Sequence, residues 1–427
     1  MTTIQTRRTA VADAVNSLLR DGLPLRFSAY DGSTAGTPES SLELVLRNRR
    51  GLAFLLTAPG ELGMVRAYLS GDLELRGVHP GDPYELLKLV QGRLEFRMPA
   101  ASEALELMQG LGLASLRPPP PPALERPPAW RRVTHGLRHS RSRDAAAISH
   151  HYDVSNTFYE HVLGPSMTYT CAVYPSEEAT LEEAQAEKYD LICRKLALKP
   201  GMRLLDVGCG WGGMVRHAAT HYGVKALGVT LSRQQAVWAA EAIAREGLAG
   251  LAEVRHGDYR DITEAGFDAV SSIGLTEHIG LRNYPAYFTF LRSRLRPEGR
   301  LLNHCITVAH NGRADMGPFM DRYVFPDGEL TGSGTIIKEA QDAGLEVMHE
   351  ENFRMHYART LTAWCRNLVD HWDECVAAAG EPTARTWGLY MAGSRLNFER
   401  NHVQLHHVLA VKTSDEGSNG FPLRPSW

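Results

Sequence analysis

Short apolar runs alternate with helical runs through the second half of the chain, and no other feature limits the possible folds as much. The strand-like runs lie at 203–207, 225–230, 252–255, 267–273 and 300–306, and helical patterns lie at 181–198, 234–246 and 284–295. Such alternation is typical of a parallel sheet covered by helices on both faces. Later runs, at 345–348 and 403–412, are expected to add strands that are partly antiparallel. The pattern therefore predicts an α/β fold.

The first strand of this series leads into a glycine-rich loop. Asp206 lies near the strand end, and Gly208, Gly210 and Gly212 follow at every second position. Glycines let the backbone turn tightly and approach a ligand without an intervening side chain. The spacing differs from the G-x-G-x-x-G of dinucleotide-binding folds, and no lysine of the Walker kind follows. The loop therefore favours S-adenosylmethionine, and it predicts a Rossmann-like class I methyltransferase domain.

The second strand ends without the acidic residue that commonly holds the ribose hydroxyls in methyltransferases. Thr230 and Gln235 are candidates for the ribose contacts, and Leu231 is a candidate for the adenine contact. Alternatively, Ser232 is simply the N-cap of the next helix. The two interpretations are compatible.

A proline-rich segment divides the chain. Seven prolines fall within residues 118–128, and proline favours an extended, semi-rigid backbone. Basic residues follow around Trp130, either as a solvated arm or as a contact with an anionic lipid surface. We predict an N-terminal domain at 1–116, a linker at 117–145 and a catalytic domain at 146–427.

The N-terminal domain carries no catalytic motif and reads as a smaller mixed α+β domain. Strands are expected at 42–47 and 52–57 with a turn at 48–51 between them, and helices at 61–69 and 84–96. The domain is a candidate for lipid docking or for dimerisation, and we expect a homo-oligomer.

Composition excludes several classes of protein. A net charge of −3 gives no overall attraction to nucleic acid, so no nucleic-acid partner is expected. The six cysteines are scattered, without metal-ligand spacing, which favours a reducing cytoplasm over disulfides and predicts no metal site. Because the sequence has no apolar run of about 18 residues, we expect peripheral contact with the inner face of the membrane.

Several motifs in order resemble the cyclopropane fatty acid synthases and the related mycolic acid methyltransferases. They lie at 151–156, 169–172, 204–213, 228–232, 257–261, 274–280, 323–328 and 357–364. The resemblance covers about residues 147–412. Residues 1–116 resemble, more weakly, the N-terminal extension of the bacterial members that act on phospholipids, which favours a phospholipid substrate.

The resemblance implies methyl transfer to a carbon–carbon double bond of a lipid acyl chain. An alkene is a poor nucleophile, so the sulfonium methyl donor must be held in line with it in a dry pocket. Transfer leaves a carbocation that water would trap, so the site must supply a single base. By resemblance this base is a bicarbonate ion, and its pocket maps onto Cys171, Glu277, His304, Ile306 and Tyr357.

The family roles of these residues compete with structural ones. Glu277 and His304 are expected to orient the anion, and Tyr357 to donate a hydrogen bond to it. Cys171 is a pocket wall in the family role, or an ordinary buried cysteine. Tyr357 is alternatively a core aromatic residue, and His304 is one of 18 histidines.

The resemblance also implies cofactor contacts outside the glycine loop. Tyr169 and Thr170 are expected to close over the cofactor, and Asp258, Tyr259 and Ile273 to flank the adenine.

Some positions depart from the pattern of a plain cyclopropane synthase. Ser155 replaces a glycine, Thr276 replaces an aromatic residue, and Asn303-His304-Cys305 replaces a more apolar sequence. Glu160 adds a carboxylate near the expected pocket entrance, or is a solvated helix residue.

These departures matter because one carbocation has two fates. Direct proton loss from the new methyl group closes a cyclopropane, whereas a hydride shift before proton loss gives an exocyclic methylene. The second outcome resembles actinobacterial enzymes that work with a flavin-dependent reductase on the way to tuberculostearic-type acids. We predict a methylene-branched product, with a cyclopropane as the alternative. Two other classes remain open, a methyltransferase for a small metabolite or protein and a non-catalytic lipid-binding protein.

Overall fold

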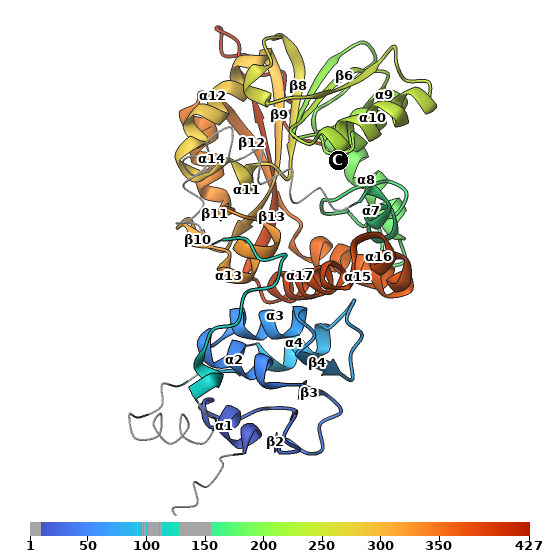
Figure 1. Ribbon diagram of the computed structural model, residues 1–427. Coiled ribbons are helices and arrows are strands. Elements are labelled where there is room, and N and C mark those ends of the chain that lie inside the picture. Colours follow the sequence, from blue (N-terminus) through green and yellow to red (C-terminus); the bar gives the residue numbers. More distant parts are fainter. Residues whose placement is uncertain are drawn as a thin grey trace, which may run out of the picture. The chain divides into compact units, whose positions relative to one another are not determined.

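Figure 1 shows the computed structural model, which describes residues 10–91, 93–95, 97, 100, 111, 113–127 and 155–427. The predicted basic stretch around Trp130 and the motif residues 151–154 lie outside this range. The chain divides into two compact units, each described by itself. The smaller unit comprises Met1–Arg126, Pro318–Val324 and Leu368–Leu396, and the larger comprises Pro127–Gly317, Phe325–Asn367 and Asn397–Trp427.

This division assigns to the smaller unit two segments, Pro318–Val324 and Leu368–Leu396, that the sequence analysis placed in the catalytic domain. The functional boundaries at 116 and 146 stay a prediction.

A seven-stranded sheet forms the centre of the larger unit (Figure 1). Its strands, in spatial order, are β12 (Glu346–Asn352), β13 (Val403–Val411), β9 (Leu295–Val308), β8 (Phe267–Ile273), β5 (Arg203–Val207), β6 (Lys225–Thr230) and β7 (Ala252–His256). The run from β9 to β7 is parallel, and β13 is antiparallel to both of its neighbours. The prediction of an α/β, Rossmann-like fold is confirmed.

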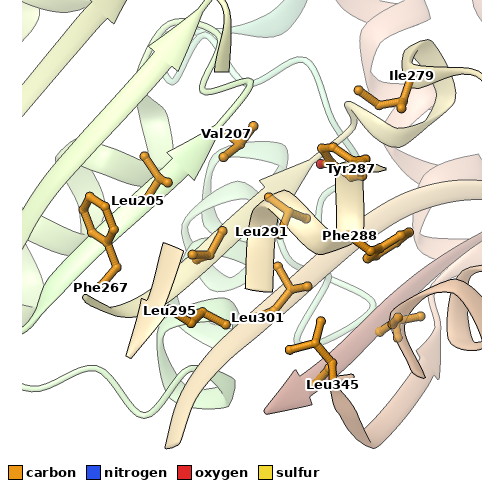
Figure 2. Close-up of a cluster of buried hydrophobic side chains, with 14 of the residues drawn as sticks. Leu205, Val207, Phe267, Ile279, Tyr287, Phe288, Leu291, Leu295, Leu301 and Leu345 are labelled. Atoms are coloured by element: carbon orange, nitrogen blue, oxygen red, sulfur yellow. The ribbon is translucent and has the colours of Figure 1, made fainter. Parts of the chain in front are cut away.

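Helices cover both faces of this sheet. They are α8 (Leu181–Lys195), α9 (Gly213–Tyr222) and α10 (Arg233–Arg245) on one face, and α12 (Tyr284–Arg294) and α14 (Ser333–Asp342) on the other. Strand β9 shows the alternation, because Leu302 packs with the first group and Leu301 with the second. Figure 2 shows part of the second cluster, where Phe288 and Leu291 of α12 lie beside Leu301. Each such buried side chain contributes about 1.5–3 kcal/mol to stability.

Helix α8 begins with a capping box. The Thr180 hydroxyl accepts from the Glu183 backbone N–H, and the Glu183 carboxylate accepts from the Thr180 backbone N–H. Its buried face includes Ala184, Lys188, Leu191 and Lys195, spaced three or four residues apart. Two lysines therefore lie where an amphipathic helix normally places apolar residues.

Other elements complete the larger unit. They are α7 (Asn156–Leu163), α11 (Thr276–Ile279), the strand pair β10 (Ala314–Asp315) and β11 (Glu329–Leu330), and two short 3₁₀ segments (Tyr259–Asp261, Leu281–Asn283). Helix α15 (Arg354–Asp370) follows β12, and most of it belongs to the larger unit. The smaller unit contains α16 (Trp372–Ala379), most of α17 (Glu381–Glu399) and the π segment Met320–Val324, which follows α13 (Gly317–Phe319) in the chain. No helix in the described part of the chain is long and apolar enough to cross a bilayer.

The smaller unit has its own four-stranded sheet, in the order β2 (Thr34–Gly36), β1 (Arg26–Ala29), β3 (Glu43–Leu46) and β4 (Leu73–Arg76). Its helices include α1 (Val11–Ser17), α2 (Arg49–Thr57), α3 (Glu61–Leu69) and α4 (Tyr84–Val90), with a 3₁₀ turn at Leu113–Leu116. The mixed α+β character is thus confirmed. The strand at 42–47 and the helix at 61–69 appear near their predicted bounds, whereas the helix predicted at 84–96 begins as predicted but ends at Val90.

The strand predicted at 52–57 is wrong, because these residues form the second half of α2. The Asn48 side chain accepts a hydrogen bond from the Gly51 backbone N–H at 3.0 Å and caps the helix. The sequence Asn48–Gly51 predicts a turn because it contains asparagine and glycine, but asparagine is equally favoured as the N-cap of a helix. The apolar run that follows packs one helical face, including Leu52 and Phe54, into the core.

Candidate active site

The loops after β5, β6, β8 and β9 meet at the carboxyl edge of the parallel strands, where ligands bind in open α/β sheets. Two groups of predicted site residues meet at this edge. We call the group around β5 and β6 the cofactor half; it consists of Asp206, Gly208, Gly210, Gly212, Thr230 and Gln235. We call the second group the acceptor half; it consists of Cys171, Glu277, His304 and Tyr357.

The glycine loop has a backbone that other residues rarely adopt. Gly208, Gly210 and Gly212 have φ angles of 78°, 54° and 74°. A Cβ atom built on Gly208 would lie 3.1 Å from the Leu275 side chain, so that position is closed to larger residues. A Cβ on Gly210 would meet nothing closer than the Gln235 amide nitrogen at 3.9 Å. The loop therefore leaves room beside Gly210 for a ligand, and it fits S-adenosylmethionine.

The polar side chains of the cofactor half are mostly paired with each other. Asp206 is buried and accepts a hydrogen bond from the Ser271 hydroxyl at 2.6 Å, and burial raises the pKa of its carboxyl to about 6. The Thr230 hydroxyl donates to Gln235 Oε1 at 2.8 Å, which leaves the Gln235 amide nitrogen facing Gly210. Ser232 caps α10, so both interpretations of this segment fit the structure. Leu231 is half-buried beside them.

The three predicted adenine neighbours occupy different surroundings. Ile273 is the last residue of β8 and is buried. The Asp258 carboxylate pairs with Arg260 at 2.6 Å. The Tyr259 ring lies edge-on to Tyr287 and to Phe290, at centroid distances of 5.4 and 5.2 Å. Their adenine contacts stay a prediction.

The segment Tyr169–Cys171 leads from two predicted cofactor contacts to Cys171 of the acceptor half. The Tyr169 ring packs between Tyr159 and Trp364, at centroid distances of 6.0 and 5.5 Å. Cys171 is fully buried, and burial raises the pKa of its thiol far above the ordinary value. A thiol in this state is not a nucleophile, which agrees with a role as a pocket wall.

Sequence reasoning missed Lys188. This residue of α8 is buried, and its ammonium donates to the Thr170 hydroxyl at 3.0 Å. Burial lowers its pKa to about 7, and the Asp206 carboxylate acts in the opposite direction. The signal was present, because Lys188 falls on the apolar face of the predicted helix.

The Glu277 carboxylate accepts a backbone hydrogen bond from β9 at a point where β8 no longer pairs with that strand. The β8–β9 pairing ends with Ile273 opposite His304, and the backbone N–H of Ile306 donates instead to Glu277 Oε1 at 2.5 Å. The second oxygen, Oε2, is buried and has no hydrogen-bond partner among the described residues. Burial raises the pKa of this carboxyl to about 7. A buried polar atom without a partner is costly, so it marks a place for a ligand.

His304, like Glu277, is buried and has one side-chain atom without a hydrogen-bond partner among the described residues. Its Nδ1 lies 2.8 Å from His407 Nε2, whereas its own Nε2 is buried without a partner in the described part of the chain. Burial lowers the pKa of the imidazole well below 6.5, so the ring is neutral at pH 7. The sheet register explains the contact, because His304 and His407 lie opposite each other on β9 and β13.

Tyr357 lies on α15 and is buried. Its ring packs against Phe398 at 4.6 Å and edge-on to Trp364 at 6.1 Å between centroids. Helix α15 is fixed beside Cys171, because the Ala172 backbone N–H donates to the Thr360 hydroxyl at 3.0 Å. The helix that carries Tyr357 therefore borders the acceptor half.

Glu160 is exposed and accepts a hydrogen bond from Trp238 Nε1 at 3.3 Å. It is not among the buried side chains of the acceptor half, and this setting is that of a solvated helix residue. A catalytic role for Glu160 stays a prediction.

Two of the departures from the family pattern contact each other. The Asn303 amide donates to the Thr276 hydroxyl at 2.6 Å, and both residues are buried. Asn303 and His304 are adjacent on β9, so the side chain of Asn303 lies on the face of the strand opposite to His304. The third departure, Ser155, caps α7 by accepting from the Phe158 backbone N–H at 3.3 Å.

The chain is similar to several known proteins. The family model described as mycolic acid cyclopropane synthetase matches residues 139–408. A probable fatty acid methyltransferase of Mycobacterium tuberculosis is 62% identical over 95% of this chain and 95% of its own length. The cyclopropane-fatty-acyl-phospholipid synthase of Escherichia coli strain K12 is 34% identical over 65% of this chain and 71% of its own length.

Solved structures give the same result. The cyclopropane synthase MmaA2 from Mycobacterium tuberculosis is 30% identical, with a TM-score of 0.60, over 63% of this chain and 98% of that one. The mycolic acid cyclopropane synthase CmaA1, complexed with SAH and CTAB, is 31% identical, with a TM-score of 0.59, over the same shares of the two chains.

Proposed function

The chain belongs to the mycolic acid cyclopropane synthetase family of S-adenosylmethionine-dependent methyltransferases that act on lipids, and from this premise we propose its substrate and product. The substrate is a phospholipid with a cis-unsaturated acyl chain. The methyl group goes to one carbon of the double bond, and a carbocation forms on the other. The product is a methylene-branched acyl chain. The names of the Mycobacterium tuberculosis and Escherichia coli relatives support a fatty acyl substrate and, for the second, a phospholipid.

The observation that carries this proposal is the pair of buried, unsatisfied polar atoms in the acceptor half, Glu277 Oε2 and His304 Nε2, for which the described residues offer no partner. Cys171, Tyr357 and Trp364, which we propose as walls of the same pocket, are all nearly inaccessible to solvent. The cofactor supplies an electrophilic methyl group. The residues of the chain exclude water from the acceptor and leave a few fixed polar atoms to bind a base.

The base that we propose is a bicarbonate ion. Because burial raises the pKa of Glu277 to about 7, this carboxyl is partly protonated at neutral pH and can donate a hydrogen bond to an anion. His304 is neutral and can donate through Nε2 if its proton is there. A neutral Glu277 suits a small anion better than an ionised one, because a second negative charge beside the anion would repel it.

The choice of a methylene over a cyclopropane product rests on the Asn303–Thr276 hydrogen bond. Thr276 immediately precedes Glu277, so this bond fixes the backbone from which the carboxyl extends. A changed position of the base alters how long the cation survives before proton loss, and a longer life favours the hydride shift. The alternative product is a cyclopropane, as the name of the Escherichia coli relative suggests.

Three further proposals follow from the same function. The enzyme contacts the inner face of the membrane peripherally, because its substrate is a membrane lipid. It assembles as a homo-oligomer, for which the N-terminal domain is the candidate surface. A flavin-dependent reductase acts as partner and saturates the methylene group.

The deciding experiment is to incubate the purified chain with S-adenosylmethionine and vesicles of a monounsaturated phospholipid, and to analyse the extracted acyl chains by mass spectrometry and proton NMR. A gain of one CH2 with vinylic methylene protons supports the proposed product. The same gain with upfield ring protons identifies a cyclopropane synthase. No gain, with intact cofactor binding, contradicts the lipid substrate and favours a small-metabolite methyltransferase.

A further inference from the structure

We propose that His407, Lys195 and Glu351 are positioning residues that fix the proton of His304 on Nε2, so that this nitrogen donates a hydrogen bond into the acceptor half. The inference rests on the proposed function only in taking the acceptor half as the place where an anion binds. It concerns how Glu351, which is partly exposed, determines through Lys195 and His407 which ring nitrogen of His304 carries the proton.

Four residues lie in a row across adjacent strands. Ile273 of β8 pairs with His304 of β9, His304 pairs with His407 of β13, and His407 pairs with Glu351 of β12. Directly opposed residues of neighbouring strands share one face of a sheet. Lys195 of α8 lies over this face, where the helix packs on the sheet.

Hydrogen bonds follow the row. His304 Nδ1 lies 2.8 Å from His407 Nε2, and His407 Nδ1 lies 3.3 Å from Lys195 Nζ. Lys195 Nζ donates to Glu351 Oε2 at 2.6 Å. The two histidines and the lysine are buried, whereas the Glu351 side chain is 40% exposed. The row therefore joins the acceptor half to the solvent edge of the sheet.

The charge of Lys195 determines which atom donates and which accepts in each hydrogen bond of the row. An ammonium group is only a donor, so a Lys195 paired with Glu351 requires His407 Nδ1 to accept. A neutral imidazole that accepts at Nδ1 carries its proton on Nε2. His407 Nε2 then donates to His304 Nδ1, and His304 in turn carries its proton on Nε2. Each step is fixed by the one before it.

The result is a preference for an anion. With the opposite tautomer, His304 Nε2 would present a lone pair, which repels a carboxylate-like oxygen. With the assigned tautomer it presents an N–H, and both rings remain neutral because burial lowers the pKa of each well below 6.5. The site can thus attract a small anion without burying a second cation beside it.

The neighbouring histidine provides an internal control. His406 lies on the opposite face of β13, where its Nδ1 lies 2.8 Å from the Thr307 hydroxyl and its Nε2 lies 3.0 Å from Glu350. It is similarly buried and has the same strand neighbours, but its contacts do not lead to His304. A change at His406 perturbs the same strands without touching the row.

The test is the tautomer itself, read by ¹⁵N NMR of the whole chain with labelled histidine, without lipid. Resonances of the two rings are assigned with His304→Gln and His407→Gln. We expect both His304 and His407 to carry their proton on Nε2. A proton on His304 Nδ1 in the unmodified chain would overturn the proposal.

Two variants test the cause. Lys195→Met fits an apolar helix face and removes the donor, and Glu351→Gln leaves the lysine without its charged partner. We expect the first to shift both histidines to a mixture of tautomers and the second to do so in part, while His406→Gln leaves them unchanged. Unaltered tautomers in Lys195→Met would contradict the proposal, as would an equal shift in His406→Gln.

Kinetics separate positioning from general damage. Lys195→Met should lower kcat for methyl transfer by about 10-fold or more, as does the loss of groups that orient a ligating histidine, with little change in the KM for S-adenosylmethionine. Lys195→Arg, which keeps a donor, should recover part of the loss. If vesicle lipids prove not to be substrates, the NMR result still stands or falls on its own, because it requires no turnover.

Discussion

The cofactor half and the acceptor half of the site are built by different means. In the cofactor half, three glycines within five residues shape a backbone cradle, and the side chains that support it already have hydrogen-bond partners, as Asp206 has in Ser271. In the acceptor half, Glu277 and His304 come from separate elements, and each keeps one buried atom that no described residue satisfies.

The two halves therefore differ in the free energy of their unliganded state. In the proposed site, the cofactor half would hold S-adenosylmethionine mainly through the shape of its backbone, because Asp206 and Thr230 already have hydrogen-bond partners. The acceptor half carries the cost of buried, unpaired polar atoms, which a bound anion and acyl chain must offset. Changes in the two halves should therefore separate binding of the cofactor from the chemical step.

The largest effect is expected from Glu277→Gln, which breaks the acceptor half alone. The amide keeps an oxygen for the Ile306 N–H but loses the carboxyl that orients the base. We expect kcat for vesicle methylation to fall by roughly 100-fold or more, in the range of general acid–base groups. Calorimetry should find the Kd for S-adenosylmethionine within about threefold of the original. A loss of cofactor affinity equal to the loss of rate would remove the distinction between the halves.

Gly208→Ala should break the cofactor half alone. Its φ of 78° and the 3.1 Å approach of Leu275 to an added Cβ impose strain of about 1–3 kcal/mol, since non-glycine residues rarely occupy this region. We expect the Kd for S-adenosylmethionine to rise about 10-fold, with kcat largely retained at saturating cofactor. Gly250→Ala, where φ is not positive and an added Cβ meets nothing within 4 Å, is the matched control. If both variants bound the cofactor normally, the loop would not be the binding cradle.

The stored cost of the acceptor half can be measured as a pH dependence of stability. Folding raises the pKa of Glu277 from 4.5 to about 7, so the folded chain retains this proton where the unfolded chain has lost it. The original chain should therefore lose stability relative to Glu277→Gln as pH rises from about 4.5 to 7, with no further change above. Thermal unfolding of the two chains across this range measures the difference. A constant difference would mean that the carboxyl is not buried as described.

The smallest effect is expected from Glu160→Gln, which lies outside both halves. The amide can still accept from Trp238, and the site is exposed. Surface changes of this kind usually alter stability by less than about 0.5 kcal/mol. The vesicle assay should show kcat and KM within about twofold of the original. A tenfold loss of rate would instead support a role for Glu160 at the pocket entrance.

The two halves also differ in how far the sequence predicts them. The cofactor half is local, and the strands at 203–207, 225–230 and 267–273 have the predicted bounds. The strand, the glycine-rich turn and the start of the helix lie within about ten residues, so the local sequence alone predicts them. The family resemblance added Glu277 and His304, but it did not reveal the bond from Glu277 to Ile306.

What the sequence could not show depends on register. Nothing local distinguishes His407 from His406, or Glu351 from Glu350, until the pairing of β12, β13 and β9 is known. Lys188 and Lys195 could have been found, because both fall on the apolar face of a predicted helix. Their partners could not be found in the same way, since these come from strands and loops distant in sequence.

The same register has a consequence for folding. From Leu405 to Val411 every residue of β13 is buried, so apolar side chains occupy both faces and would pack tolerably if the strand slipped by one position. A slip by one position in either direction would, however, break at least one of the two pairs, His407 with His304 or His406 with Thr307, and would leave two buried polar groups unpaired. The two adjacent histidines thus favour a single register of the last strand against β9. The register that completes the sheet is therefore also the register that brings His407 to His304 in the acceptor half.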